Sequence, residues 1–154
     1  MGNPESGMWS QVKEALGGIF GRGLSDERRM EVEVTFALFG FVAKADGLIT
    51  SYETEFAQKL LDELELNIDG RDLAMAAYDQ GRTLGFDVEP VVKRFLEKYP
   101  AGSEEMERLF ESLLRLALSD DRVYPRERQA LERLAAAFEV SVKSLDQRLA
   151  TLRK

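Results

Sequence analysis

The sequence predicts an all-α fold, a compact bundle of about seven to eight helices with an internal pseudo-twofold duplication. Apolar residues recur at helical spacing along nearly the whole chain, and alternating β-branched runs bounded by turn residues are absent. In addition, the second and third predicted helices are matched by the sixth and seventh when the chain is shifted by about 74 residues. The length of 154 residues suits one compact domain.

Residues 1–24 are predicted to form an amphipathic helix followed by a glycine-rich linker. The helix extends from about Met8 to Phe20, and Gly17 and Gly18 weaken its end. Its polar face offers only Lys13 as a base, so electrostatic attraction to lipid is weak. We expect this helix to pack against the bundle or a partner, and any membrane association to be peripheral.

Residues 25–154 are predicted to form the helical domain. Its first helix starts after Ser25, which suits an N-cap, and stops at Gly47, with its most apolar positions facing inward. Pro100 and Gly102 break the chain in the middle of the domain. Short loops favour antiparallel neighbours in a bundle. The remaining helices are expected at residues 50–64, 69–83, 87–99, 104–119, 125–138 and from 141 onward.

The composition excludes several function classes. The chain has 28 acidic and 21 basic residues, a formal charge of −7, and neither cysteine nor histidine. Disulfides, cysteine or histidine metal sites and Ser-His or Cys-His nucleophile pairs are therefore absent. Because the basic residues are scattered among acids, a nucleic-acid partner is not expected. No apolar run is long enough to cross a bilayer and no signal peptide follows the start, so we expect a cytoplasmic protein.

The duplication aligns acidic residues as well as core positions. Asp46 aligns with Asp120, and Glu53 aligns with Glu127. In each copy the aspartate lies at the end of one predicted helix and the glutamate at the start of the next, with a turn between them. The spacing from Asp46 to Glu53 imitates the second half of an EF-hand loop, but the earlier loop positions carry apolar residues or lysine, which excludes an EF-hand. The aligned core pairs include Phe36 with Phe110, Phe39 with Leu113, Val42 with Leu116, Ala43 with Ala117, and Leu60 with Leu134.

Two interpretations of these acids stay open. Glu53 completes a capping box with Thr50, and Glu127 lies just inside a helix start after Pro125, so both glutamates suit capping roles. Asp46 and Asp120 follow helix C-termini, where a negative charge is locally unfavourable unless its side chain bonds the next turn. Alternatively, the two hairpins bring all four carboxylates together around a hard cation, Ca²⁺ or Mg²⁺.

At these residues the sequence resembles the TerB-like domain of tellurite-resistance proteins. Val34 to Gly47 resembles the family's first helix hairpin, and Ala117 to Glu127, with the following Leu131 to Ala135, resembles its second. Gln80-Gly81-Arg82 resembles the branch of the family found in DjlA co-chaperones. The resemblance covers roughly residues 31–149 and implies an internally duplicated helical fold with Asp46, Glu53, Asp120 and Glu127 as metal candidates.

The resemblance implies a non-enzymatic module with protein partners in stress-response or chaperone-linked assemblies. DjlA-type proteins also carry a transmembrane anchor and a J-domain with an essential histidine, and neither is expected in these 154 residues. Asp121 replaces the turn glycine expected in the second copy. Two alternatives remain: a carboxylate- and Mg²⁺-dependent enzyme, and a purely structural helical unit that forms a homodimer.

Overall fold

The computed structural model describes residues 26–45, 68–118 and 125–152, and in these ranges it is a bundle of helices without strands. The helices are α2 (Asp26–Ala45), α4 (Ile68–Gly81), α5 (Val88–Lys98), α6 (Glu104–Ala117), α7 (Pro125–Ala137) and α8 (Val142–Leu152). The all-α prediction is confirmed. Six of the expected helices coincide with these six, whereas those predicted at Met8–Phe20 and at residues 50–64 lie outside the described residues. The predicted total of seven to eight helices is therefore not confirmed.

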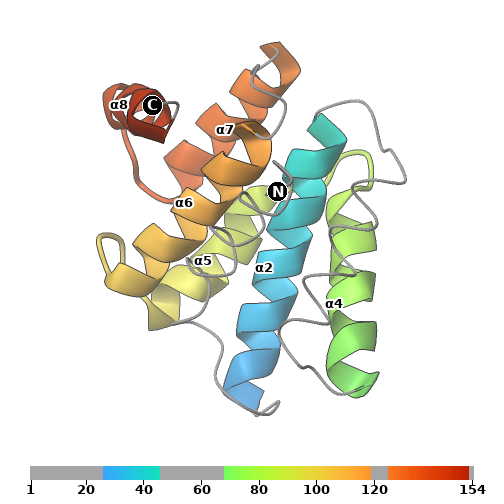
Figure 1. Cartoon of the computed structure of the whole chain (residues 1–154). Helices are drawn as coiled ribbons and strands as arrows, with labels where there is room; N and C mark the ends of the chain where they lie inside the picture. Colours follow the sequence, from blue (N-terminus) through green and yellow to red (C-terminus); the bar gives the residue numbers. More distant parts are fainter. Residues whose placement is uncertain (1–25, 46–67, 119–124, 153–154) are drawn as a thin grey trace, which may run out of the picture.

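Helix α2 is the centre of the bundle. It packs against α4, α5, α6 and α7, while α8 lies at the edge against α7 (Figure 1). Its inward side chains Phe36 and Phe39 are at most 1% exposed, which confirms the predicted core face of this helix. A helix surrounded on several sides has to be apolar over most of its circumference, as this stretch of sequence is.

Capping side chains explain where the later helices begin. Asp87 accepts a hydrogen bond from the backbone N–H of Glu89 at 3.1 Å before α5. Ser103 accepts one from Met106 at 3.3 Å before α6, and Ser141 accepts one from Ser144 at 3.1 Å before α8. Each cap satisfies a backbone donor that has no partner within its helix.

Two glycines allow α2 and α4 to approach closely. A Cβ on Gly40 would lie 2.2 Å from the carbonyl oxygen of Tyr78, and a Cβ on Gly81 would lie 1.9 Å from that of Ala37. Both distances are far below van der Waals contact, so only glycine fits at either position. The close crossing at Gly81 lies at the last residue of α4, directly before the turn that leads into α5.

The core joins the remaining helices through aromatic side chains. Phe138, which directly follows α7, is fully buried with its ring centroid 5.4 Å from Phe110 of α6 and 6.5 Å from Phe95 of α5. Among the aligned pairs of the duplication, Phe36 and Phe110 are both fully buried. In a second pair, Phe39 and Leu113, each side chain is at most 1% exposed. Because residues 46–67 lie outside the described part, the pseudo-twofold duplication itself stays a prediction.

Candidate functional site

The predicted metal ligands fall mostly outside the described residues. Asp46, Glu53 and Asp120 lie there, so the structure does not test whether they converge. Glu127 is described: it is 2% exposed in the first turn of α7, two residues after Pro125 at the first helical position. Within residues 26–45, 68–118 and 125–152, no group of three or more acidic side chains could hold a metal ion.

A second buried carboxylate ties α2 to the end of α5. Glu31, 2% exposed, accepts hydrogen bonds from the Lys98 ammonium at 3.1 Å and from the Tyr99 hydroxyl. Burial lowers the pKa of Lys98, but its hydrogen bonds and charge contacts with Glu31 and Tyr99 outweigh that effect and raise the pKa. Burial raises the pKa of the Tyr99 hydroxyl, and its hydrogen bond to Glu31 adds to the rise. Through these contacts, Glu31, Lys98 and Tyr99 connect α2 to the end of α5.

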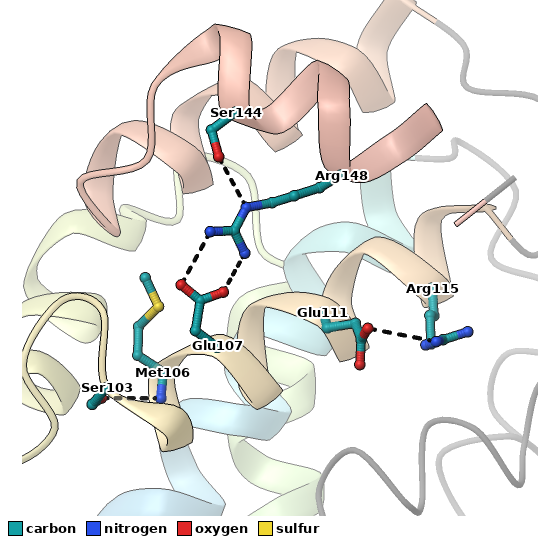
Figure 2. A network of polar contacts seen from close by, with 7 residues as sticks. All are labelled: Ser103, Met106, Glu107, Glu111, Arg115, Ser144 and Arg148. Carbon is teal, nitrogen blue, oxygen red and sulfur yellow. Dashed lines mark hydrogen bonds and ion pairs between the residues drawn. The ribbon is translucent and has the colours of Figure 1, made fainter. Parts of the chain in front are cut away.

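A groove between α6 and α8 is built around one bidentate ion pair. Figure 2 shows the Arg148 guanidinium facing the Glu107 carboxylate, with Nη2 donating to Oε1 at 3.0 Å and Nη1 donating to Oε2. The Nε of Arg148 donates to the Ser144 hydroxyl at 3.1 Å, and its guanidinium carbon lies 5.4 Å from the centroid of the Phe110 ring. The hydrogen bond from Arg148 lowers the pKa of Glu107, although burial opposes it.

The groove has a volume of about 350 Å³, but its charges are already matched. Arg148 pairs with Glu107, and Arg108 pairs with Glu104 on the same helix. Further along α6, Glu111 lies 3.5 Å from Arg115, as Figure 2 also shows. A groove whose cations are neutralised from within joins α8 to α6 rather than attracting a charged ligand.

A smaller pocket lies where α2 ends, α4 turns into α5 and α7 begins. Its volume is about 250 Å³, and Ala45 of α2 and Arg126 of α7 both line it. These are the residues directly before Asp46 and Glu127 in the sequence. Two further cations, Lys44 and Arg133, are among the described residues that line it. We call this pocket, defined by the described residues that line it, the basic pocket.

Sequence reasoning missed this pocket because its cations are scattered along the chain. Lys44 is separated from Arg126 by more than half of the sequence, and Arg133 lies two turns further along α7. The sequence did contain one local sign of the pocket: Lys44 and Arg126 each lie within two residues of a predicted metal ligand, Asp46 and Glu127 respectively. Only the packing of α7 against α2 brings them to one place.

The sequence of this helical bundle matches a known family of domains. The family model described as "Tellurite resistance protein TerB" matches residues 33–149, and the chain belongs to this family. No solved structure gives a significant match. None of the described helices is long and apolar enough to cross a membrane.

The similar curated proteins carry the name "Co-chaperone protein DjlA". The protein of Vibrio parahaemolyticus is 30% identical over 142 residues, which cover 91% of this chain and 50% of the relative. That of Vibrio cholerae is 31% identical over 134 residues, 86% of this chain and 47% of the relative. That of Photobacterium profundum is 30% identical over 139 residues, which cover 86% of this chain and 50% of the relative. The chain thus spans about half the length of the curated relatives it matches.

Proposed function

We propose that the chain is a non-enzymatic interaction module that recognises protein partners in co-chaperone-linked or stress-response assemblies. The observation that carries the proposal is the match to DjlA co-chaperones over 91% of this chain. The match covers 50% of that relative, so the proposed module corresponds to about half of the Vibrio parahaemolyticus protein. A domain within a co-chaperone is expected to contribute contacts with other proteins, whereas its fold alone does not specify a reaction.

We further propose that the duplicated acidic turns bind a divalent cation through Asp46, Glu53, Asp120 and Glu127. The basic pocket supports convergence of the turns, because Ala45 and Arg126, the neighbours of Asp46 and Glu127, line it together. Burial of Glu127 adds support, since a buried carboxylate favours a hydrogen-bonded or metal-bound state. An all-oxygen ligand set suits Ca²⁺ or Mg²⁺.

Thermal unfolding with and without these ions tests the metal site. A cation at one hundred times its dissociation constant stabilises a folded protein by about 2.7 kcal/mol, which raises the Tm by about 5–10 °C for a chain of this size. Asp46→Asn with Asp120→Asn is expected to abolish the rise. Asp72→Asn with Asp79→Asn, two exposed positions on α4, is the matched control and is expected to keep it. A Tm that does not change at millimolar Ca²⁺ or Mg²⁺ contradicts the metal site.

Cross-linking in bacterial cells, followed by mass spectrometry, tests the interaction module. We expect components of the chaperone machinery to be cross-linked to the chain more often than to an unrelated acidic helical protein of similar size. A set of cross-linked proteins no different from that control would refute the co-chaperone association, whatever the metal experiment shows.

A further inference from the structure

The connection between α7 and α8 contains a strained residue. Glu139 has a φ of 61°, and in the described ranges it is the only residue other than glycine with a positive φ. A residue with a Cβ is disfavoured in this left-handed region, which glycine usually occupies at the end of a helix. The chain therefore turns back after α7 against the conformational preference of the residue at the turn.

The hydrogen bonds at this turn can be exchanged for helical ones. The N–H of Glu139 donates to the Ala136 carbonyl at 3.1 Å, and the N–H of Val140 donates to the Ala135 carbonyl at 2.7 Å. This is the pattern of a Schellman motif. If α7 continued instead, the N–H of Glu139 would donate to Ala135 and that of Val140 to Ala136. Neither N–H would lose its partner, and the left-handed φ would disappear.

The sequence allows α7 and α8 to form a single helix. After Pro125, which is at the first position of α7, no glycine or proline occurs up to Lys154. A continuous helix over residues 125–152 would be about 42 Å long. Straightening costs the cap that Ser141 provides to the N–H of Ser144, and it removes α8 from its own bundle. An isolated copy therefore keeps α8 folded back.

The contacts of α8 are ones that a second copy can reproduce. This helix lies at the edge of the bundle and buries Leu145 and Leu149 (Figure 1). Two ion pairs also hold it, Arg148 with Glu107 of α6 and Asp146 with Arg128 of α7. If α8 of one copy lies on α6 and α7 of another copy, the same residue pairs form between the two chains. The exchange therefore preserves the contacts of α8.

The order of charges identifies the segment that fits on α6 and α7. Arg128 of α7 faces the acid Asp146, and Glu107 of α6 faces the base Arg148 two residues further along α8. A segment with the opposite order of charges would meet a like charge at both places. A second copy of this chain supplies the matching order together with both leucines, so it is the occupant that these contacts favour.

We propose that two copies of the chain exchange α8. Residues 139–141 straighten, α7 and α8 become one helix, and each α8 packs on α6 and α7 of the other copy. Such an exchange gives a closed, symmetric dimer, and short strained hinges favour it. Because the contacts of α8 exist in both forms, the hinge and the chain concentration decide between monomer and dimer. This proposal goes beyond the proposed function and uses neither the acidic turns nor the basic pocket.

Size-exclusion chromatography with light scattering tests the proposal on the full chain. The chain is unfolded in urea and refolded at micromolar or at millimolar concentration. We expect a dimer whose fraction rises with the concentration during refolding. The dimer is expected to dissociate slowly after dilution, because each α8 has to detach before the two copies separate. A chain that stays monomeric after refolding at millimolar concentration would overturn the proposal.

Glu139→Gly tests the hinge. Glycine adopts a φ of 61° without strain and also lowers the stability of a continuous helix, so both effects favour the monomer. Each hinge is expected to contribute at least about tenfold, so the dissociation constant of a dimer with two hinges rises at least about a hundredfold. Because Glu139 is exposed, the variant is expected to fold with an unchanged or higher Tm.

The matched control for the hinge is Glu97→Gly, which makes the same replacement at an exposed position of α5. It is expected to change the dissociation constant of the dimer less than about threefold. If Glu139→Gly weakens the dimer no more than this control does, the dimer does not depend on the hinge and the proposal is wrong.

Mixing two charge-reversed variants tests whether α8 is the exchanged segment. Glu107→Arg and Arg148→Glu each place like charges at the ion pair between α6 and α8. When the two variants are refolded together, each α8 meets an opposite charge only on the other variant. We expect heterodimers to exceed the two homodimers together at least about tenfold in native mass spectrometry. A mixture without this preference would show that another surface forms the dimer.

The control mixture reverses an ion pair that the exchange leaves within each chain. Arg94 of α5 lies 3.4 Å from Glu33 of α2. Glu33→Arg refolded with Arg94→Glu is therefore expected to give no preference for heterodimers, and an equal preference in both mixtures would also overturn the proposal. Because the metal-dependent Tm and the cross-linking to chaperone components are measured separately, failure of the α8 exchange leaves the proposed function standing.

Discussion

Replacing Gly40 with alanine adds one methyl group at the closest approach of α2 and α4. In the native structure a Cβ at this position would lie 2.2 Å from the Tyr78 carbonyl oxygen and 3.1 Å from its carbonyl carbon. Ordinary contact begins at 3.4 Å, so the two backbones have to separate by about 1.2 Å. Neither obstructing atom belongs to a flexible side chain, so the clash cannot be relieved by a rotamer change.

Two opposing effects set the change in the free energy of unfolding on Gly40→Ala. Alanine is better than glycine in the middle of a helix by about 1 kcal/mol. Overpacking against a rigid neighbour costs about 1–3 kcal/mol, and occasionally more, and here the separation also loosens the packing of Ala74 and Ala77 against α2. We expect Gly40→Ala to lower the free energy of unfolding by about 2 kcal/mol and the Tm by about 4–8 °C.

Urea unfolding monitored by circular dichroism measures this effect, with Ala76→Gly as the control. Ala76 is on the exposed face of α4, where the reverse change reports helix propensity alone and is expected to cost about 1 kcal/mol. If Gly40→Ala stabilises the protein by about the amount that Ala76→Gly costs, the close crossing of the two helices is refuted.

The remaining predictions concern the α6–α8 ion pair and the aromatic core. Arg148 holds the pKa of Glu107 in the folded protein below its usual value of 4.5. The ion pair therefore contributes its full stability above about pH 4.5, and this contribution is lost as the pH falls through the pKa of Glu107 in the folded protein. Glu107→Gln is therefore expected to cost about 0.5–1 kcal/mol in urea unfolding at pH 6 and almost nothing at pH 2; an equal cost at both pH values would contradict the ion pair. Phe138→Ala is expected to cost about 3–5 kcal/mol in the same assay at neutral pH, since the ring is fully buried between Phe95 and Phe110, and a cost below about 1 kcal/mol would contradict this packing.

The sequence predicted the helices well because their signals are local. The apolar spacing and the breaks at Pro100 and Gly102 placed α5 and α6 within about two residues of their observed bounds. The end of α4 was misplaced by two residues: the helix was expected to reach Thr83 but stops at Gly81. There the chain tightens into the turn in which the Phe86 N–H donates to the Thr83 carbonyl. The close approach of Gly81 to Ala37 of α2 lies at the same point, and this contact between distant residues has no local signal in the sequence.

Contacts between distant residues were beyond sequence reasoning. Glu31 and Tyr99 are 68 residues apart and Glu107 and Arg148 are 41 apart, so nothing in the local pattern couples them. The structure also gives a physical reason for one residue of the DjlA-like segment: Gly81 is required because any side chain there would meet the backbone of Ala37. Of the predicted acidic site, only the buried position of Glu127 is described.

Convergence of the two acidic turns is most directly tested by NMR spectroscopy of the chain during titration with Mn²⁺, a paramagnetic ion that accepts the same oxygen ligands as Mg²⁺ and Ca²⁺. If the turns form one site, the backbone amide signals of Ala45 and Arg126 lose intensity together at the same Mn²⁺ concentration. Asp120→Asn then weakens both effects by the same factor. If the two signals respond at different concentrations, or if neither responds at millimolar Mn²⁺, the turns do not share a cation and the proposed metal site is wrong.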